Sequence, residues 1–186
     1  MERAARGAAV VAKSQPLNPL IERSRFLPSY DAEDIEAVGQ LAEKIFREWA
    51  DHHTLDYHKN DQSPETFARS FKNETKRSDY EISIKDFGII VVDVKALQLR
   101  DAYGDFILDE IEIRKQLSFQ EKFRNPVWFA IIPRTGLQYY TFYWISLNCI
   151  RETIAKKYSG IGPFYPVPIK ACTPVGWKDG IGKLLF

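Results

Sequence analysis

Three charged side chains near the middle of the chain have the types and spacing to support metal chemistry. Asp93 and Lys95 stand two residues apart in an apolar run, so a β-strand would place both on one face, about 7 Å apart. The sequence KDFG, at positions 85–88 before this run, is typical of a hairpin turn. A hairpin centred on Asp86 would set Asp79 opposite Asp93, with the two Cβ atoms about 5 Å apart. We therefore expect two carboxylates and an ammonium to meet on one face of a sheet.

Two carboxylates this close favour binding of a divalent cation. Mg²⁺ prefers oxygen ligands and keeps part of its hydration shell, and without a cation the two charges would repel. Lys95 could then position the water that attacks a scissile phosphate. The alternative is a cross-strand salt bridge on an exposed face. The apolar sequence around Asp93 favours the metal site, because unpaired buried charges are costly. The prediction depends on the hairpin register, since a slip of one residue would place Asp79 and Asp93 on opposite faces of the sheet.

The elements that must position these residues follow from periodicity and turn signals. Apolar residues at three- and four-residue steps predict an amphipathic helix with Asp31 as its N-cap and its end near His52 and His53. A polar connection follows, and Pro64 opens a short predicted helix. The remaining expected elements are strands over 79–85 and 88–97, a segment at 105–113 that fits either a strand or the start of a helix to about 124, strands over 126–132 and 139–146, and a helix over 147–158.

This order of elements predicts a single α/β core with a mixed sheet flanked by helices in three layers. A chain of 186 residues with 13% aromatic residues is long enough to bury one sizeable core. Residues 1–30 are expected to form a basic arm and residues 31–158 the core domain. Residues 159–186 are rich in Gly and Pro, and we expect them to pack on the core as loops and a short strand.

Charge is distributed unevenly along the chain. The net charge is +3 in residues 1–30, −6 in residues 31–150 and +4 in residues 151–186, which add to the total of +1. Basic ends around an acidic centre suit a protein that contacts phosphates around a metal site, and ordinary scatter of surface charge is the alternative. The candidate phosphate contacts are Arg23, Arg25, Lys156, Lys157 and Lys170.

Two glutamines are further candidates near the predicted site. Gln98 follows Lys95 by three residues and Gln120 lies in a later predicted helix, so each could orient water or phosphate or serve the fold alone. The two cysteines, Cys149 and Cys172, have neither metal-ligand spacing nor a disulfide framework, which indicates a reduced, intracellular and cytoplasmic protein. The sequence contains no signal peptide and no apolar run that would span a membrane, so no membrane partner is expected.

The motif residues resemble those of the PD-(D/E)XK nuclease superfamily. Asp79 stands at the position of the first acid, and DVK, from Asp93 to Lys95, matches the D-x-K motif. Within the superfamily the pattern is nearest to archaeal Holliday-junction resolvases, whose first helix resembles VGQLAEKIFREWA with Glu43 four residues after Gly39. The segment RKQLSFQEKFRNPVWFAII resembles their later helix that leads through a proline into a strand. The resemblance covers roughly residues 35–132, with Ser78 in place of the motif proline.

The resemblance implies a restriction-endonuclease-like fold and a metal-dependent endonuclease that hydrolyses phosphodiester bonds in DNA, in restriction, repair and recombination, or mobile-element biology. It implies Mg²⁺ or Mn²⁺ held by Asp79, Asp93 and the main-chain carbonyl of Val94, with Glu43 as an additional acid and Lys95 positioning the water. Two cuts on a duplex would favour a homodimer. Two alternatives are a nuclease-fold module that binds nucleic acid or a partner without cutting, and an RNA endonuclease of the same superfamily.

Overall fold

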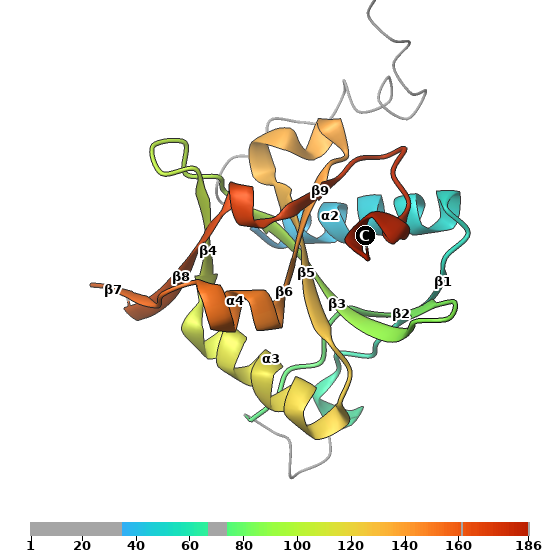
Figure 1. Ribbon diagram of the computed structural model, residues 1–186, viewed down its shortest axis with the longest axis horizontal. Helices are drawn as coiled ribbons and strands as arrows, with labels where there is room; N and C mark the ends of the chain where they lie inside the picture. The colour runs from blue at the N-terminus through green and yellow to red at the C-terminus, as the bar shows by residue number, and fades with distance from the viewer. Residues whose placement is uncertain (1–34, 67–73, 161, 186) are drawn as a thin grey trace, which may run out of the picture.

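A six-stranded mixed sheet forms the centre of the protein (Figure 1). The computed structural model describes residues 35–66, 74–160 and 162–185. The strand order is β1-β2-β3-β5-β6-β9, and within it β3 and β5 run parallel while the other neighbours are antiparallel. The strands are β1 (Asp56–Lys59), β2 (Tyr80–Ile84), β3 (Gly88–Leu97), β5 (Val127–Pro133), β6 (Phe142–Ser146) and β9 (Thr173–Val175).

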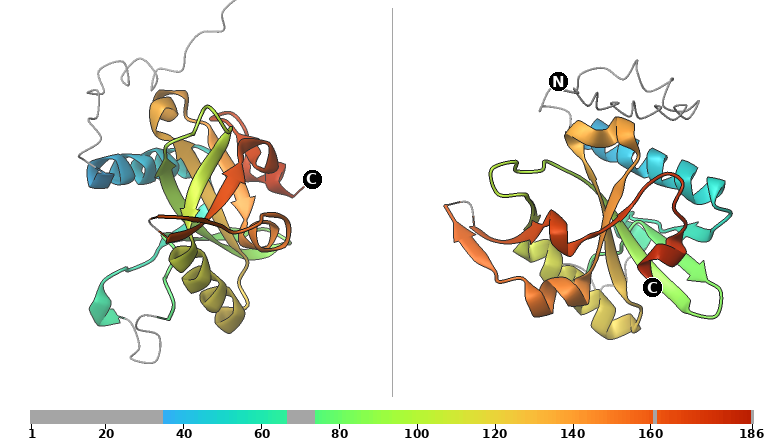
Figure 2. Two further views of the ribbon diagram at one scale, coloured as in Figure 1. Left: turned by 90° about the vertical axis from the view of Figure 1, so that its left-hand side faces the viewer. Right: turned by 45° about the horizontal axis from the view of Figure 1, so that its top comes forward.

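Helices cover both faces of this sheet (Figures 1 and 2). Helix α2 (Ile35–His52) packs its buried stripe against one face, where Tyr80, Ile82 and Val92 contribute to the same core. Helices α3 (Glu110–Phe123) and α4 (Leu147–Thr153) pack on the other face with Val91 and Phe129. Because side chains alternate along a strand, Asp93 and Lys95 share the face of Val91, which α3 covers. The expected three-layer α/β core with a mixed sheet is confirmed.

A second sheet of three strands lies beside the first. Its order is β4-β8-β7, formed by β4 (Asp105–Asp109), β8 (Gly162–Pro168) and β7 (Lys157–Ser159). The Gly- and Pro-rich sequence of residues 159–186 predicted loops and a short strand, whereas seven of these residues, three of them prolines, form β8. The backbone nitrogens of Pro166 and Pro168 point away from β4, because the N–H of the next residue, Ile169, donates to the Gly104 carbonyl on the β4 side. β7 ends before it reaches these two prolines, so their missing N–H groups interrupt no ladder.

Several predicted elements agree with the structure and others do not. The end of α2, the hairpin strands, β5 and β6 are confirmed, and the ambiguous segment is both a strand, β4, and the start of α3. The polar connection after α2 instead contains β1, an exposed edge strand with no apolar alternation to reveal it. Helix α4 ends at Thr153, earlier than expected.

Short 3-10 helices complete the described elements: η1 (Pro64–Thr66), η3 (Arg134–Tyr139), η4 (Ile169–Ala171) and η5 (Ile181–Leu184). The predicted N-cap Asp31, the basic arm and the continuation of the helix from Pro64 lie outside the described residues. In the part of the chain that the structure describes, no helix is both long and apolar enough to cross a membrane.

Candidate active site

The β2–β3 hairpin has the predicted register. Tyr80 pairs with Val92 and Ile84 with Gly88, so the hairpin is centred on Asp86 as expected. Asp86 adopts a positive φ of 63°, which an Asp in a tight turn tolerates. Asp79 precedes the first paired residue of β2, and continuation of this register sets it opposite Asp93. The turn therefore brings the two predicted carboxylates onto neighbouring strands.

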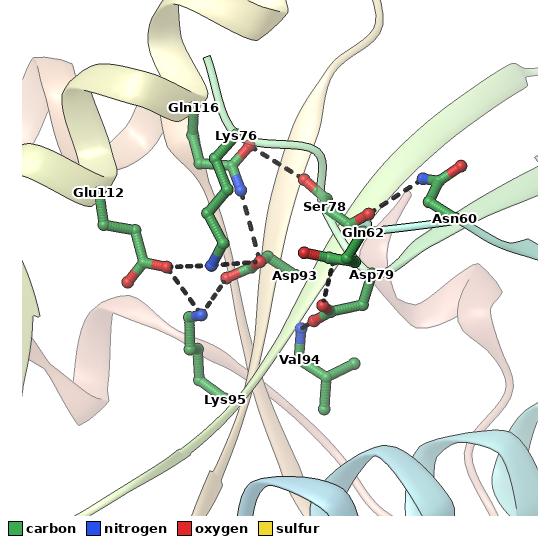
Figure 3. A network of polar contacts seen from close by, with 10 residues as sticks. All are labelled: Asn60, Gln62, Lys76, Ser78, Asp79, Asp93, Val94, Lys95, Glu112 and Gln116. Atoms are coloured by element: carbon green, nitrogen blue, oxygen red, sulfur yellow. Dashed lines mark hydrogen bonds and ion pairs between the residues drawn. The ribbon is translucent and has the colours of Figure 1, made fainter. Parts of the chain in front are cut away.

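Asp79 is tied to β3 at the point where β2 begins (Figure 3). Its Oδ2 accepts a hydrogen bond from the Val94 amide at 2.7 Å, and its Oδ1 accepts one from the Gln62 side chain at 2.8 Å. In an extended strand, the N–H and C=O of one residue point to the same side. The Val94 carbonyl therefore points to the same side of β3 as Asp79, beyond the first pair of the β2–β3 ladder.

Asp93 is fully buried and lies between two lysines (Figure 3). Its Oδ2 is 2.7 Å from Lys95 Nζ, and its Oδ1 is 3.2 Å from Lys76 Nζ. Both ammonium groups also contact Glu112 Oε1, Lys95 at 2.7 Å and Lys76 at 2.5 Å. Two carboxylates and two ammoniums thus form a closed ring of four ion pairs, here called the charge ring: Lys76, Asp93, Lys95 and Glu112.

Helix α3 supplies one side of the charge ring. Asp109 caps the helix by accepting a hydrogen bond from the Ile111 amide at 2.6 Å, which fixes the first turn. Glu112 and Gln116 are four residues apart, so they lie on one face of the helix. Gln116 is fully buried, accepts from the Ser78 hydroxyl at 3.0 Å and approaches Asp93 Oδ1 with its amide at 3.4 Å.

The electrostatics of the site follow from burial and from these contacts. Burial, followed by the charge of Asp93, raises the pKa of Asp79 to about 7, although Lys95 and the Val94 amide oppose this. Burial disfavours the charged form of Lys95, but Asp93 and Glu112 outweigh it and raise the Lys95 pKa above its ordinary value. Burial likewise opposes ionisation of Glu112, yet Lys95 and Lys76 hold its pKa below the usual range. Lys95 is therefore an ammonium at neutral pH.

The donor set fits a hard divalent cation that retains water. Burial and then the charge of Asp93 raise the Asp79 pKa, and a dication would remove the repulsion between the two carboxylates. Asp93 Oδ2 is buried, and the Lys95 ammonium contacts it at 2.7 Å. Among the residues that the structure describes, no group of three or more His, Cys, Asp or Glu side chains is placed to hold a metal. Mg²⁺ commonly needs only one or two carboxylates.

Glu43 lies on the α2 side of the sheet. Its Oε2 accepts from Lys59 Nζ at 2.8 Å and is 3.5 Å from the Tyr80 hydroxyl. Tyr80 belongs to the α2 core, whereas Asp93 faces α3, so the sheet separates the two environments. Among the described contacts, none brings Glu43 to Asp79 or Asp93, and its role at a metal stays a prediction from the resemblance.

The other predicted contacts are spread away from the charge ring. Gln120 donates to Asn148 at 2.8 Å and accepts from the Val127 amide at 2.9 Å, which joins α3, α4 and β5. Gln98 is exposed and donates to the Leu99 carbonyl. The predicted basic contacts divide into three groups: Lys156 lies 3.9 Å from Glu110, Lys157 and Lys170 are exposed, and Arg23 and Arg25 lie outside the described residues.

Four site residues were missed by the sequence analysis: Gln62, Lys76, Glu112 and Gln116. Lys76 and Gln62 lie outside the hairpin, in irregular segments whose path the sequence pattern does not predict. Glu112 and Gln116 carried a signal, because their spacing places both on one face once α3 is known to begin at Glu110. The uncertainty between strand and helix at 105–113 concealed it.

Comparisons with known proteins find similarity of structure only. No protein-family model matches the chain, and no curated protein matches its sequence. The chain is similar to a Holliday junction resolvase from the archaeal hyperthermophile Archaeoglobus fulgidus, with 8% identity, a TM-score of 0.48, and coverage of 77% of this chain and 93% of that one. It is also similar to a nuclease from a fusselovirus, with 14% identity, a TM-score of 0.47, and coverage of 86% and 92%.

At these identities and TM-scores the similarities carry no argument about the chemistry of this chain. The fold and the site by themselves define a three-layer α/β protein with two carboxylates and a buried ammonium where β2 meets β3.

Proposed function

We propose that the protein is a Mg²⁺- or Mn²⁺-dependent endonuclease that hydrolyses phosphodiester bonds in DNA. The observation that carries this proposal is the meeting of Asp79 and Asp93 at the β2–β3 junction, with Lys95 Nζ 2.7 Å from Asp93. The spacing of these three residues is the part of the sequence that resembles the PD-(D/E)XK nucleases. DNA as the substrate, the metal and the assembly as a homodimer are part of the proposal.

Each residue of the site has a chemical task under this proposal. Asp79, Asp93 and the Val94 carbonyl would hold the metal, which when bound lowers the pKa of a water and offsets phosphate charge. Lys95 is held as an ammonium by Asp93 and Glu112, so it donates hydrogen bonds. It would orient the attacking oxygen and stabilise the negative charge that develops on the phosphate oxygens. The Gln116 amide, 3.4 Å from Asp93 Oδ1, would help to hold the Asp93 carboxylate in position.

A second candidate function is a nucleic-acid-binding module that does not cleave. The observation that favours it is the charge ring itself, because both Asp93 and Glu112 are already neutralised by two lysines. A structural ion-pair network of this kind would hold α3 to β3 without any metal. This candidate predicts salt-sensitive binding of nucleic acid and no product when Mg²⁺ is added.

A cleavage assay with a panel of substrates distinguishes the endonuclease from the binding module. The wild-type protein is incubated with plasmid, linear, single-stranded and four-way-junction DNA and with RNA, in Mg²⁺, Mn²⁺ or EDTA. We expect metal-dependent cleavage of DNA, lost by at least about a hundredfold in Asp93→Asn and Lys95→Ala. Lys122→Ala serves as the control, since its ion pair with Glu74 is exposed and outside the charge ring. Cleavage by both active-site variants at the wild-type rate would remove the assignment.

A further inference from the structure

Lys76 is the most accessible ammonium of the charge ring. Its side chain is 30% exposed, compared with 19% for Lys95, and Asp93 beneath it is fully buried. It belongs to the irregular segment that leads into Asp79, and its ammonium lies beside both Glu112 and Asp93 (Figure 3). Of the two lysines that contact Asp93, Lys76 therefore has the larger exposed fraction available to a substrate.

Glu112 holds Lys76 independently of Asp93. The Lys76 ammonium contacts Glu112 Oε1 at 2.5 Å and Asp93 Oδ1 at the longer distance of 3.2 Å. An ammonium on a four-carbon chain has three donors and rotates easily, so it can exchange one partner while it keeps another. If Asp93 serves as a metal ligand, Lys76 loses that partner but remains at the site through Glu112.

The charges of the site match a phosphodiester only when Lys76 is counted. In the charge ring, the carboxylates of Asp93 and Glu112 balance the ammoniums of Lys76 and Lys95. With a dication held by the carboxylates of Asp79 and Asp93, the three carboxylates, two ammoniums and the dication would leave one positive charge, which a single phosphodiester anion neutralises. Without Lys76 the same site would be neutral before the phosphate arrives, and the attraction for the substrate would be lost.

We propose that Lys76 is a second catalytic lysine, which neutralises Asp93 when no metal is bound and contacts the scissile phosphate when a metal occupies the site. Glu112 is the positioning residue that keeps Lys76 in place through this exchange. The inference rests on the proposed function, since it names a residue that binds substrate in the same reaction. It also makes Lys76 a competitor of the metal for Asp93.

The test compares Lys76→Met with the matched control Lys122→Met, because Lys122 is also a partly exposed lysine that pairs with an acid, Glu74. Metal affinity is measured by calorimetry with Mn²⁺ and the full chain, without nucleic acid. Removing a positive charge and a competitor should tighten Mn²⁺ binding by about tenfold. At saturating Mn²⁺, single-turnover cleavage of the DNA that the wild type cuts should slow by about a hundredfold. The control should change neither quantity.

Tighter Mn²⁺ binding together with slower cleavage would distinguish a catalytic role of Lys76 from a purely structural one. A purely structural Lys76 would weaken Mn²⁺ binding and cleavage together, and that result would overturn the inference, as would cleavage at the wild-type rate. Lys76→Arg keeps the charge and should cleave within about fivefold of the wild type. If the wild type cleaves none of the substrates, the proposed function and this inference both fail. If it cleaves and Lys76→Met cleaves equally well, only the inference fails.

Discussion

At the scale of single residues, the site is a balance between burial and charge. Asp93 has no exposure, and its two lysine partners compensate for the loss of water. No lysine of the described residues contacts Asp79, which accepts hydrogen bonds from Gln62 and the Val94 amide. The two acids of the pair are therefore unequal. The pKa of Asp79 is raised to about 7, so its protonation state changes near neutral pH.

This inequality predicts a pH-dependent stability that Asp79→Asn removes. The pKa of Asp79 is raised from 3.8 to about 7, so between these values the folded protein binds a proton that the unfolded chain has lost. Without metal, the free energy of unfolding of the wild type should fall as pH rises from about 4 to 7, by up to about 1.4 kcal/mol per pH unit, and then level off.

Urea denaturation in EDTA at several pH values tests this prediction. Asp79→Asn has no titrating group at this position, so its stability relative to the wild type should increase between about pH 4 and pH 7. A difference between the two proteins that stays constant over this range would contradict the assignment of the raised pKa to Asp79.

At the scale of elements, the β2–β3 hairpin could be predicted from the sequence, but the segments that pack around it could not. The KDFG turn and the apolar run of β3 fix a register by local rules, so Asp79, Asp93 and Lys95 meet as expected. Glu112 and Lys76 reach the site through long-range packing of α3 and of an irregular segment. β1 has a polar sequence and forms only because β2 offers it a partner.

Gln120 illustrates the structural role that the sequence left open beside a contact with water or phosphate. It links the end of α3 to β5 and α4, so Gln120→Ala should lower the free energy of unfolding by about 1–2 kcal/mol, because it leaves the Val127 amide without this acceptor. Gln98→Ala, at an exposed position, should change stability by less than about 0.5 kcal/mol. Chemical denaturation measures both, and equal stability of the two variants would contradict the linking role.

At the scale of the whole molecule, the C-terminal segment is part of the core and not an appendage. β9 adds the last strand to the central sheet, and Val175 and Ile181 are buried in the α2 core. Trp49 donates to the Asp179 carbonyl at 3.1 Å, and a ring nitrogen of His53 lies 2.8 Å from the Trp177 carbonyl, so the segment runs along α2 (Figure 1). Its Gly and Pro content suggested loops and a short strand packed on the core. The particular contacts with α2 could not be predicted, because their partners lie more than a hundred positions away in the sequence.

A chain that ends at Cys172 should therefore lose much of its stability. Loss of the buried Val175 and Ile181 side chains alone should lower the free energy of unfolding by about 3–6 kcal/mol, which is comparable with the total stability of a small domain. Thermal unfolding should show a strongly lowered or absent cooperative transition, whereas Lys178→Ala, at an exposed position, should unfold as the wild type does. Cooperative unfolding of the shortened chain at the wild-type temperature would show that the segment is dispensable.

The central claim is that Asp79 and Asp93 together bind a divalent metal, and calorimetric titration of the full chain with Mn²⁺ at pH 8 tests it most directly. We expect one site in the wild type, loss of that site in Asp79→Asn and Asp93→Asn, and wild-type binding in Glu81→Gln, whose residue lies two residue pairs further along the hairpin. Wild-type Mn²⁺ affinity in Asp93→Asn would contradict the claim.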